Sequence, residues 1–270
     1  MSPAEAPVVL LDWPLPRVAR LRINRPDKRN AIDHAVRQQL GEAVDAVTQL
    51  AAQGEARALV FGGVGGVFSA GGDLPTMVGL DEAGARARMR HVAALCRRVA
   101  GLRIPVLSAV EGFGAGAAVG LALLGDRIVV GEGTRILFPF LRLGLVPDWG
   151  QLATLPRRIG LAAARRILCS EQPVGGAEAL RIGLADTLVA DAEVMPEALR
   201  QAQALAALPA DAYARMKARL QVPSASLDEE LQREEDDQAA CLRSDDFREG
   251  YDAFAHKRAP DFVARPGASR

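Results

Sequence analysis

The chain has 270 residues, of which 49% are hydrophobic and 24% charged, and its 33 basic side chains balance 33 acidic ones. This length and apolar content predict one large domain, or a domain with a small appendage, and exclude a disordered chain or a small disulfide-stabilised scaffold. A nucleic-acid-binding protein usually carries a basic excess, and the zero net charge argues against that class.

Cysteine usage and apolar segments indicate the cellular setting. Cys96, Cys169 and Cys241 lie far apart, so neither a disulfide framework nor a metal site is predicted from them. The longest apolar stretch, 113–125, has 13 residues and four glycines, which is too short to span a bilayer. Residues 1–7 lack a basic region followed by an apolar run, so no signal peptide is expected. We expect a cytoplasmic protein without membrane contact.

Strands and helices are predicted to alternate in the first half of the chain. Asp33 is a predicted N-cap for a helix to Ala52, and a second helix over 81–100 is predicted from inward-facing Met89, Val92, Leu95 and Val99. An apolar helix follows the glycine-rich turn at 112–116. This order predicts an α/β fold. Short apolar runs predict strands at 8–11, 18–23, 58–61, 105–110 and 126–130.

From about Trp149 the chain is predicted to be mainly helical, with one strand at 184–189. Seven acidic residues in 228–237 predict a solvated helix face. The last helix is expected over 245–257, and the tail after Phe262 is expected to fray.

Two glycine-rich loops, 62–72 and 112–116, each follow a predicted strand and precede a helix. Helix N-termini expose unpaired N–H groups, and small residues let a ligand approach them. Two such loops face to face would form an oxyanion hole with two N–H donors. Tight turns that only allow close packing are the alternative for each loop.

The second loop also matches a dinucleotide-binding fingerprint. Gly112, Gly114 and Ala117 fit G-x-G-x-x-A, and Glu132 follows the first glycine by twenty residues. This match starts more than 100 residues into the chain and leaves the other loop unexplained, so a nicotinamide cofactor is not favoured.

Six segments, in order, resemble the enoyl-CoA hydratase/isomerase family of the crotonase superfamily. The resemblance implies an α/β spiral of ββα turns over residues 1–195, which holds the acyl-CoA site, and a helical trimerisation region over 196–270. It implies an acyl-CoA thioester substrate, with coenzyme A as part of that substrate and no separate cofactor or metal. Assembly into homotrimers or homohexamers is implied as well. The segments are INRPDKRNAI (23–32), FSAGGDL (68–74), AVEGFGAG (109–116), LGLVPDWG (143–150), ALRIGLAD (179–186) and EGYDAFAHKR (249–258).

The same resemblance assigns site residues. The backbone N–H groups of Ala70 and Ala117 match the two oxyanion-hole donors, which would stabilise an enolate formed next to the thioester. Phe254 and Lys257 match positions that often reach the CoA of a neighbouring subunit. The remaining positions implied to contact CoA are Lys28, Arg29, Ala31, Gly71, Gly72, Asp73, Leu74 and Gly116.

The chain departs from the family pattern at both glutamates that hydratases use, where it has Gly120 and Phe140. Hydration needs one group to activate water and another to deliver a proton, so ordinary two-glutamate hydration is not expected. Asp148 matches an aspartate of isomerase-type members, and one carboxylate suffices to move a double bond. An N-cap of the following helix is the alternative role for Asp148.

Three functions remain open. The favoured one is an enoyl-CoA isomerase with Asp148 as acid and base. The others are a different enolate reaction, such as ring isomerisation, decarboxylation or dehalogenation, and a CoA-ester-binding protein without catalysis. Ser69 lacks a histidine at a family position and is expected to form a loop hydrogen bond. Structural or surface roles are expected for Glu111, Asp126, His34, His91 and His256.

Overall fold

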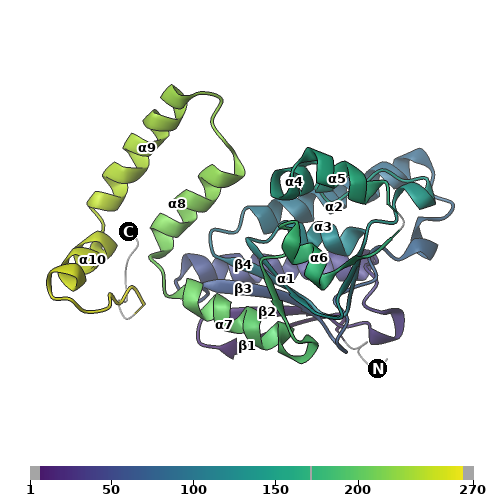
Figure 1. The fold of residues 1–270 in the computed structure, drawn as a ribbon, viewed down its shortest axis with the longest axis horizontal. Coiled ribbons are helices and arrows are strands. Elements are labelled where there is room, and N and C mark those ends of the chain that lie inside the picture. The colour runs from purple at the N-terminus through teal and green to yellow at the C-terminus, as the bar shows by residue number, and fades with distance from the viewer. Residues whose placement is uncertain (1–6, 171, 264–270) are drawn as a thin grey trace, which may run out of the picture.

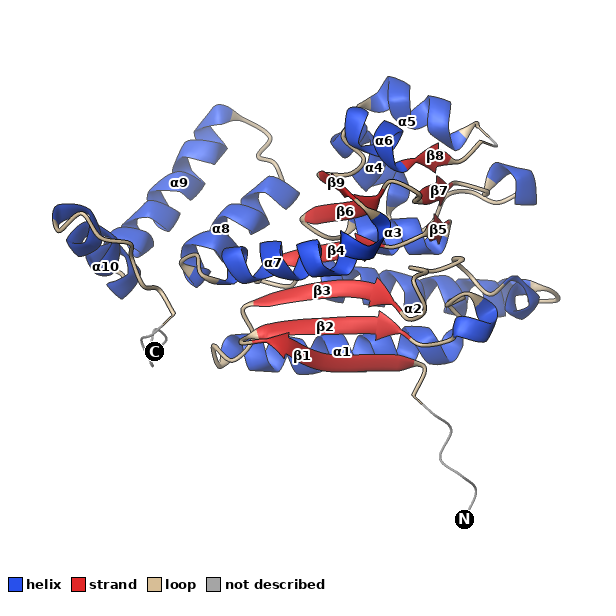
Figure 2. Ribbon diagram, turned by 60° about the horizontal axis from the view of Figure 1, so that its bottom comes forward, coloured by secondary structure: helices blue, strands red, loops and turns tan. Residues whose placement is uncertain are grey.

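A six-stranded sheet organises the fold, in the order β1-β2-β3-β4-β6-β9 (Figure 2). The computed structural model describes residues 7–170 and 172–263, so the expectations for the N-terminus and for the frayed tail fall almost entirely outside it. Strand β1 pairs antiparallel with β2, and the other neighbours are parallel. The strands are β1 (Val9–Leu15), β2 (Val18–Ile23), β3 (Ala58–Gly63), β4 (Val106–Val110), β6 (Arg127–Gly131) and β9 (Thr187–Val189).

Helices cover both faces of this sheet, as a mainly parallel sheet requires. Because strand side chains alternate, Leu59 and Phe61 join the core under helices α1 (His34–Ala52), α2 (Glu82–Ala100) and α3 (Ala117–Leu123), whereas Ala58 and Val60 face α7 (Val194–Ala206). The predicted inward face of α2 is confirmed except for Met89, which is 41% exposed.

Local sequence signals set the helix starts. The Asp33 carboxylate accepts a hydrogen bond from Val36 N, as predicted, and Asp81 caps α2 in the same way through Gly84 N. A smaller sheet holds β5 (Phe113–Ala115), β7 (Arg135–Leu137) and β8 (Val174–Gly175). Beside it lie α4 (Gln151–Ile159), α5 (Leu161–Leu168) and α6 (Gly176–Arg181). Short 3-10 helices span Pro26–Lys28, Leu74–Met77, Leu141–Leu143 and Asp191–Glu193.

The last three helices extend away from the sheet (Figure 1). They are α8 (Ala210–Gln221), α9 (Leu227–Leu242) and α10 (Asp245–Ala255). The predicted division at residue 195 falls inside α7, which packs on the sheet, so the helices that leave the core begin with α8. Helix α9 buries none of its residues, which confirms the predicted solvated acidic face. No helix in the described ranges is both long and apolar enough to cross a membrane.

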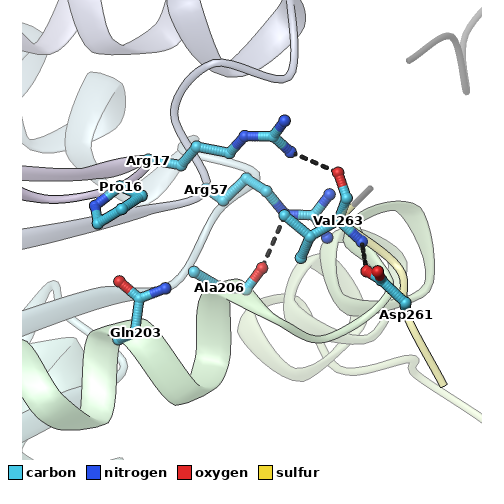
Figure 3. Close-up of a pocket in the computed structure, with 7 residues that line it drawn as sticks. All are labelled: Pro16, Arg17, Arg57, Gln203, Ala206, Asp261 and Val263. Atoms are coloured by element: carbon cyan, nitrogen blue, oxygen red, sulfur yellow. Dashed lines mark hydrogen bonds between the residues drawn. The ribbon is translucent and has the colours of Figure 1, made fainter. Parts of the chain in front are cut away.

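A cavity of about 360 Å³ lies where the end of the described chain returns to the core (Figure 3). Arg17 donates to Val263 O there at 2.9 Å, and the Arg57 guanidinium donates to the carbonyl oxygens of Ala206, Leu208 and Phe262. The two arginines therefore have a structural role, because they attach the C-terminal segment to α7 and to the edge of the sheet. None of the predicted site residues lines it.

Candidate active site

The two glycine-rich loops run side by side and are hydrogen-bonded to each other. Ser69 N donates to Phe113 O, and Ala115 N donates to Ser69 O, both at 3.1 Å. Gly71 has a φ of +87°, and a Cβ there would lie 2.3 Å from Ala115 O and 3.4 Å from Ala117 N. Both the positive φ and the lack of space for a Cβ require glycine at this position. The close contact brings the first loop to the N-terminus of α3.

The N–H groups of Ala117 and Gly72 are available to a ligand, because neither donates to another group in the described parts of the chain. The prediction for Ala70 is wrong, since its N–H donates to Arg29 O at 2.9 Å. Gly71 N donates to Ser69 Oγ. The free donor of the first loop therefore lies two residues beyond the predicted one.

Buried polar groups hold the first loop in place. Ser69 Oγ donates to Asn30 O at 2.7 Å, which confirms the expected loop hydrogen bond. The Asn30 amide donates to Val64 O and Val67 O. Both Ser69 and Asn30 are fully buried, so these bonds are shielded from water and fix the loop firmly.

Most of the predicted CoA positions lie together beside this loop. Ile32 and Gly72 form a bridge between the two segments, which brings 28–31 close to 71–74. Lys28 and Arg29 are exposed, and Leu74 is 45% exposed. The Asp73 carboxylate is held by Arg25 Nη1 at 3.1 Å, so its charge is already paired.

Phe254 and Lys257 are not brought to the loops. Phe254 lies on α10, away from the sheet, and is 84% exposed, and Lys257 follows the same helix (Figure 1). Within one chain these two residues do not contribute to the site, so their predicted role stays a prediction about a neighbouring subunit.

Asp148 lies half-buried ahead of α4. Burial raises the pKa of its carboxyl from 3.8 to about 6, although the Arg88 and Arg37 charges partly oppose this shift. Its Oδ1 is buried without a hydrogen-bond partner in the described structure. The N-cap alternative is wrong, because Gly150 occupies the N-cap of α4 and the Asp148 side chain does not cap it. The Asp148 carboxylate is therefore not used to cap α4.

Gln151 joins the Asp148 segment to the second loop, and the sequence analysis missed it. Its side-chain nitrogen donates to Asp148 O at 3.0 Å and to Gly116 O at 3.2 Å, and the residue is fully buried. Since Gly116 precedes Ala117, one amide group positions both the carboxylate segment and an N–H donor. No motif marks this glutamine, and only the fold reveals its contacts.

The two positions without glutamate are filled by apolar side chains. A Cβ at Gly120 would lie 2.3 Å from Trp149 Cβ, so the tryptophan occupies the space of the missing side chain. Phe140 is buried, and its ring tip lies 3.7 Å from the Cβ position of Gly116. The surroundings of the second loop thus exclude water rather than activate it.

The other carboxylates considered lie elsewhere. Asp126 accepts hydrogen bonds from Val106 N and Lys217 Nζ, both at 2.8 Å, which is a structural role. Burial raises the pKa of Glu111, and the charges that oppose this shift are Arg22 and Arg20, not those around Asp148.

Comparison with known proteins identifies the family. Residues 16–265 match the sequence profile described as enoyl-CoA hydratase/isomerase. The chain belongs to this family. A crystal structure described as a putative enoyl-CoA hydratase from Streptomyces coelicolor is similar with a TM-score of 0.88 and 32% identity, and the match covers 98% of each chain. The predicted resemblance and the crotonase-type α/β fold are therefore confirmed.

Two curated relatives show the range of the family. A probable enoyl-CoA hydratase of Rhodobacter capsulatus is 34% identical, and the 1,2-epoxyphenylacetyl-CoA isomerase of Escherichia coli is 32% identical. Each match covers 92% of this chain and 95% of the relative. The chain is an enzyme of the enoyl-CoA hydratase/isomerase family that acts on CoA thioesters.

Proposed function

We propose that this enzyme moves the double bond of a 3-enoyl-CoA into conjugation with the thioester. The observation that carries the proposal is a lone, half-buried carboxylate, Asp148, beside a second loop whose glutamate positions are Gly120 and Phe140. The named hydratase and isomerase relatives are nearly equally similar, so their names do not decide between the reactions. A single carboxylate at the family's catalytic positions favours isomerisation, because hydration uses two.

In the proposed mechanism, the thioester oxygen accepts hydrogen bonds from the N–H groups of Gly72 and Ala117. Ionised Asp148 removes a proton from the carbon next to the thioester, and the electron pair moves onto the oxygen as a dienolate. Two backbone donors stabilise such an oxyanion by about 3 kcal/mol each. Protonated Asp148 then returns its proton two carbons further along the acyl chain, which leaves the conjugated isomer and the ionised carboxylate.

The environment of Asp148 suits both halves of this cycle. A pKa of about 6 leaves the carboxylate ionised at neutral pH, yet makes it a stronger base than an ordinary aspartate. The buried Phe140 and Trp149 exclude water that would otherwise compete for the intermediate. Coenzyme A is part of the substrate and the reaction is redox-neutral, so no further cofactor or metal is proposed.

We also propose assembly into homotrimers or homohexamers. The outer helices leave many apolar side chains in water, and a monomer rarely exposes so many together. In the assembly, Phe254 and Lys257 would reach the CoA of a neighbouring subunit. A cytoplasmic location stays a prediction. The exposed side chains on α8–α10 are Met216, Leu220, Leu227, Leu231, Leu242, Phe247, Tyr251 and Phe254.

The proposal is tested by incubating wild type, Asp148→Asn and Asp45→Asn with a 3-enoyl-CoA and separating the products by chromatography and mass. Wild type is expected to give the conjugated isomer at unchanged mass, with kcat/KM rising as the pH passes about 6. Asp148→Asn should lower kcat by roughly 10³-fold, as loss of a general base does. Asp45, an exposed carboxylate on α1, provides the control and should leave turnover unchanged. Hydrated product, or no turnover despite binding, would contradict isomerisation of this substrate.

A further inference from the structure

A cavity of about 260 Å³ between α1 and α2 is lined by two arginines and two histidines, together with Thr76, Leu80, Gly84 and Ala87. Arg37 and His34 come from α1, and Arg88 and His91 from α2. None of the described residues that line it is acidic. A water-sized volume is about 30 Å³, so the space is large enough for a short chain of heavy atoms.

Arg37 is the unusual member of this cavity. Its side chain is buried, with the residue only 3% exposed, and neither Nε nor Nη1 has a hydrogen-bond partner in the described structure. Burial lowers the pKa of this guanidinium to about 10, and repulsion from Arg88 adds to the shift, so it is still protonated at neutral pH. The charges of Asp33 and Asp148 oppose this lowering only in part, and a buried charge whose hydrogen-bond donors stay unpaired destabilises the fold unless a bound group supplies acceptors.

Arg88 adds a second cation that forms no ion pair with a described carboxylate, although the charges of Asp148 and Asp73 act on it. Among the described residues its hydrogen bond is a long one, 3.5 Å from Nη1 to Thr76 Oγ1. By contrast, the arginine of the neighbouring loop, Arg25, is paired with both Asp33 and Asp73. The cavity therefore presents two guanidinium groups that form no direct ion pair with any described carboxylate, although the charges of Asp33, Asp73 and Asp148 act on them from a distance.

The cavity adjoins the reaction site. Arg88 Nη2 lies 3.5 Å from the position that a Cβ of Gly72 would take, next to a proposed oxyanion donor. The charges of Arg88 and Arg37 also act on Asp148. A group bound here would be the distal part of an acyl chain whose thioester lies at Gly72 and Ala117.

We propose that Arg37 and Arg88 bind a carboxylate at the far end of the acyl group, so that the preferred substrates are CoA monothioesters of dicarboxylic acids. This inference rests on the proposed acyl-CoA site. Guanidinium groups form bidentate hydrogen bonds with carboxylates, and a carboxylate would supply the acceptors that Arg37 lacks. Phosphates of coenzyme A offer the same chemistry, and the test separates the two sources.

The test compares the binding of adipoyl-CoA and hexanoyl-CoA, which share the coenzyme and differ by the terminal carboxylate. Both acyl groups are saturated, so binding to the full-length protein by calorimetry is independent of turnover and of the Asp148 mechanism. Wild type is expected to bind adipoyl-CoA at least tenfold more tightly. Arg37→Met and Arg88→Met should each bring the ratio near one by weakening adipoyl-CoA alone.

Arg86→Met is the matched control, because Arg86 lies on α2 like Arg88 but is exposed and paired with Glu82. It should preserve the wild-type ratio of the two binding affinities. Thermal unfolding checks that each variant is folded, and the half-buried Arg88 provides a second variant if Arg37→Met does not fold. Equal wild-type affinities would overturn the proposal and leave the two arginines as charges that act only on Asp148. A parallel loss of both ligands in the variants would overturn it as well, and would assign the arginines to the coenzyme phosphates.

Discussion

The proposed reaction site and the outer helices α8–α10 are held by different forces. All seven residues of α3 are buried, and the two loops beside it are joined by backbone hydrogen bonds. Helix α9 buries no residue, and ion pairs such as Arg215 with Asp237 attach it to α8. Exposed ion pairs contribute about 0–1 kcal/mol each, whereas buried apolar packing contributes much more.

This difference suggests that the two regions have different roles. The Gly72, Ala117 and Asp148 groups are positioned within one chain by packing that salt does not screen. The outer helices keep apolar side chains exposed, and in the proposed assembly these side chains would contact other copies of the chain. Four variants, the first of them a double substitution, probe this contrast.

The largest effect is expected from Tyr251→Ser combined with Phe254→Ser. These side chains are 67% and 84% exposed on α10, and burying each in an interface stabilises it by about 1.5–3 kcal/mol. Their loss should dissociate the assembly at micromolar concentration, as measured by light scattering. The control is Trp13→Ser, which removes an exposed aromatic side chain from β1 and should leave the mass of the assembly unchanged. An unaltered oligomer in the double variant would show that α10 lies outside the interface.

Gly120→Glu restores one family glutamate and tests whether the site can be a hydratase. The Cβ would clash with Trp149 Cβ at 2.3 Å, so we expect a loss of about 3 kcal/mol in unfolding free energy and no hydration of a 2-enoyl-CoA. Urea unfolding and a hydration assay measure both. Gly175→Glu, at a position with open space and ordinary φ, is the control and should change stability by less than about 0.5 kcal/mol. Normal stability with new hydration would contradict the packing argument.

Asp148→Asn should stabilise the protein at high pH. The folded pKa of Asp148, about 6, lies above its unfolded value of 3.8, so the fold favours the protonated form and wild type loses stability as the pH rises through 6. The permanently neutral amide avoids this loss and should gain about 1–2 kcal/mol at pH 8, with no gain near pH 3.5. Denaturant unfolding at both pH values measures it. A gain that is independent of pH would exclude ionisation of Asp148 as its cause, and Asp45→Asn should show no gain.

The smallest effect is expected for Arg219→Gln, which removes ion pairs to Glu230 and Asp237 between α8 and α9. Because salt screens such pairs, the loss of unfolding free energy should stay below about 1 kcal/mol and become smaller at high salt. Unfolding at low and high ionic strength measures it. A loss above 2 kcal/mol would indicate that ion pairs dominate this region after all.

Some site assignments could be predicted because they depend on residue type at a motif position. Ala117, Asp148 and the absent glutamates at Gly120 and Phe140 were assigned in this way, and the roles of Ala117 and Asp148 stay predictions with which the geometry of the Ala117 N–H is compatible. Ala70 was wrong because a hydrogen bond to Arg29, about forty residues away, decides which N–H of the loop stays free.

The sequence by itself determined the strands of the main sheet and the helices between them, the Asp33 cap and the family, since alternation, capping and motifs are local signals. It did not predict the short strands β5, β7 and β8 of the smaller sheet. Only the tertiary structure decided that Gly72 N–H donates to no other described group, that Gln151 connects the Asp148 segment to the second loop, and that Arg37 is buried with two nitrogens lacking hydrogen-bond partners among the described residues. These features depend on contacts between segments tens of residues apart. Hydrogen bonds and charges there are set by packing geometry, which residue type and spacing do not encode locally.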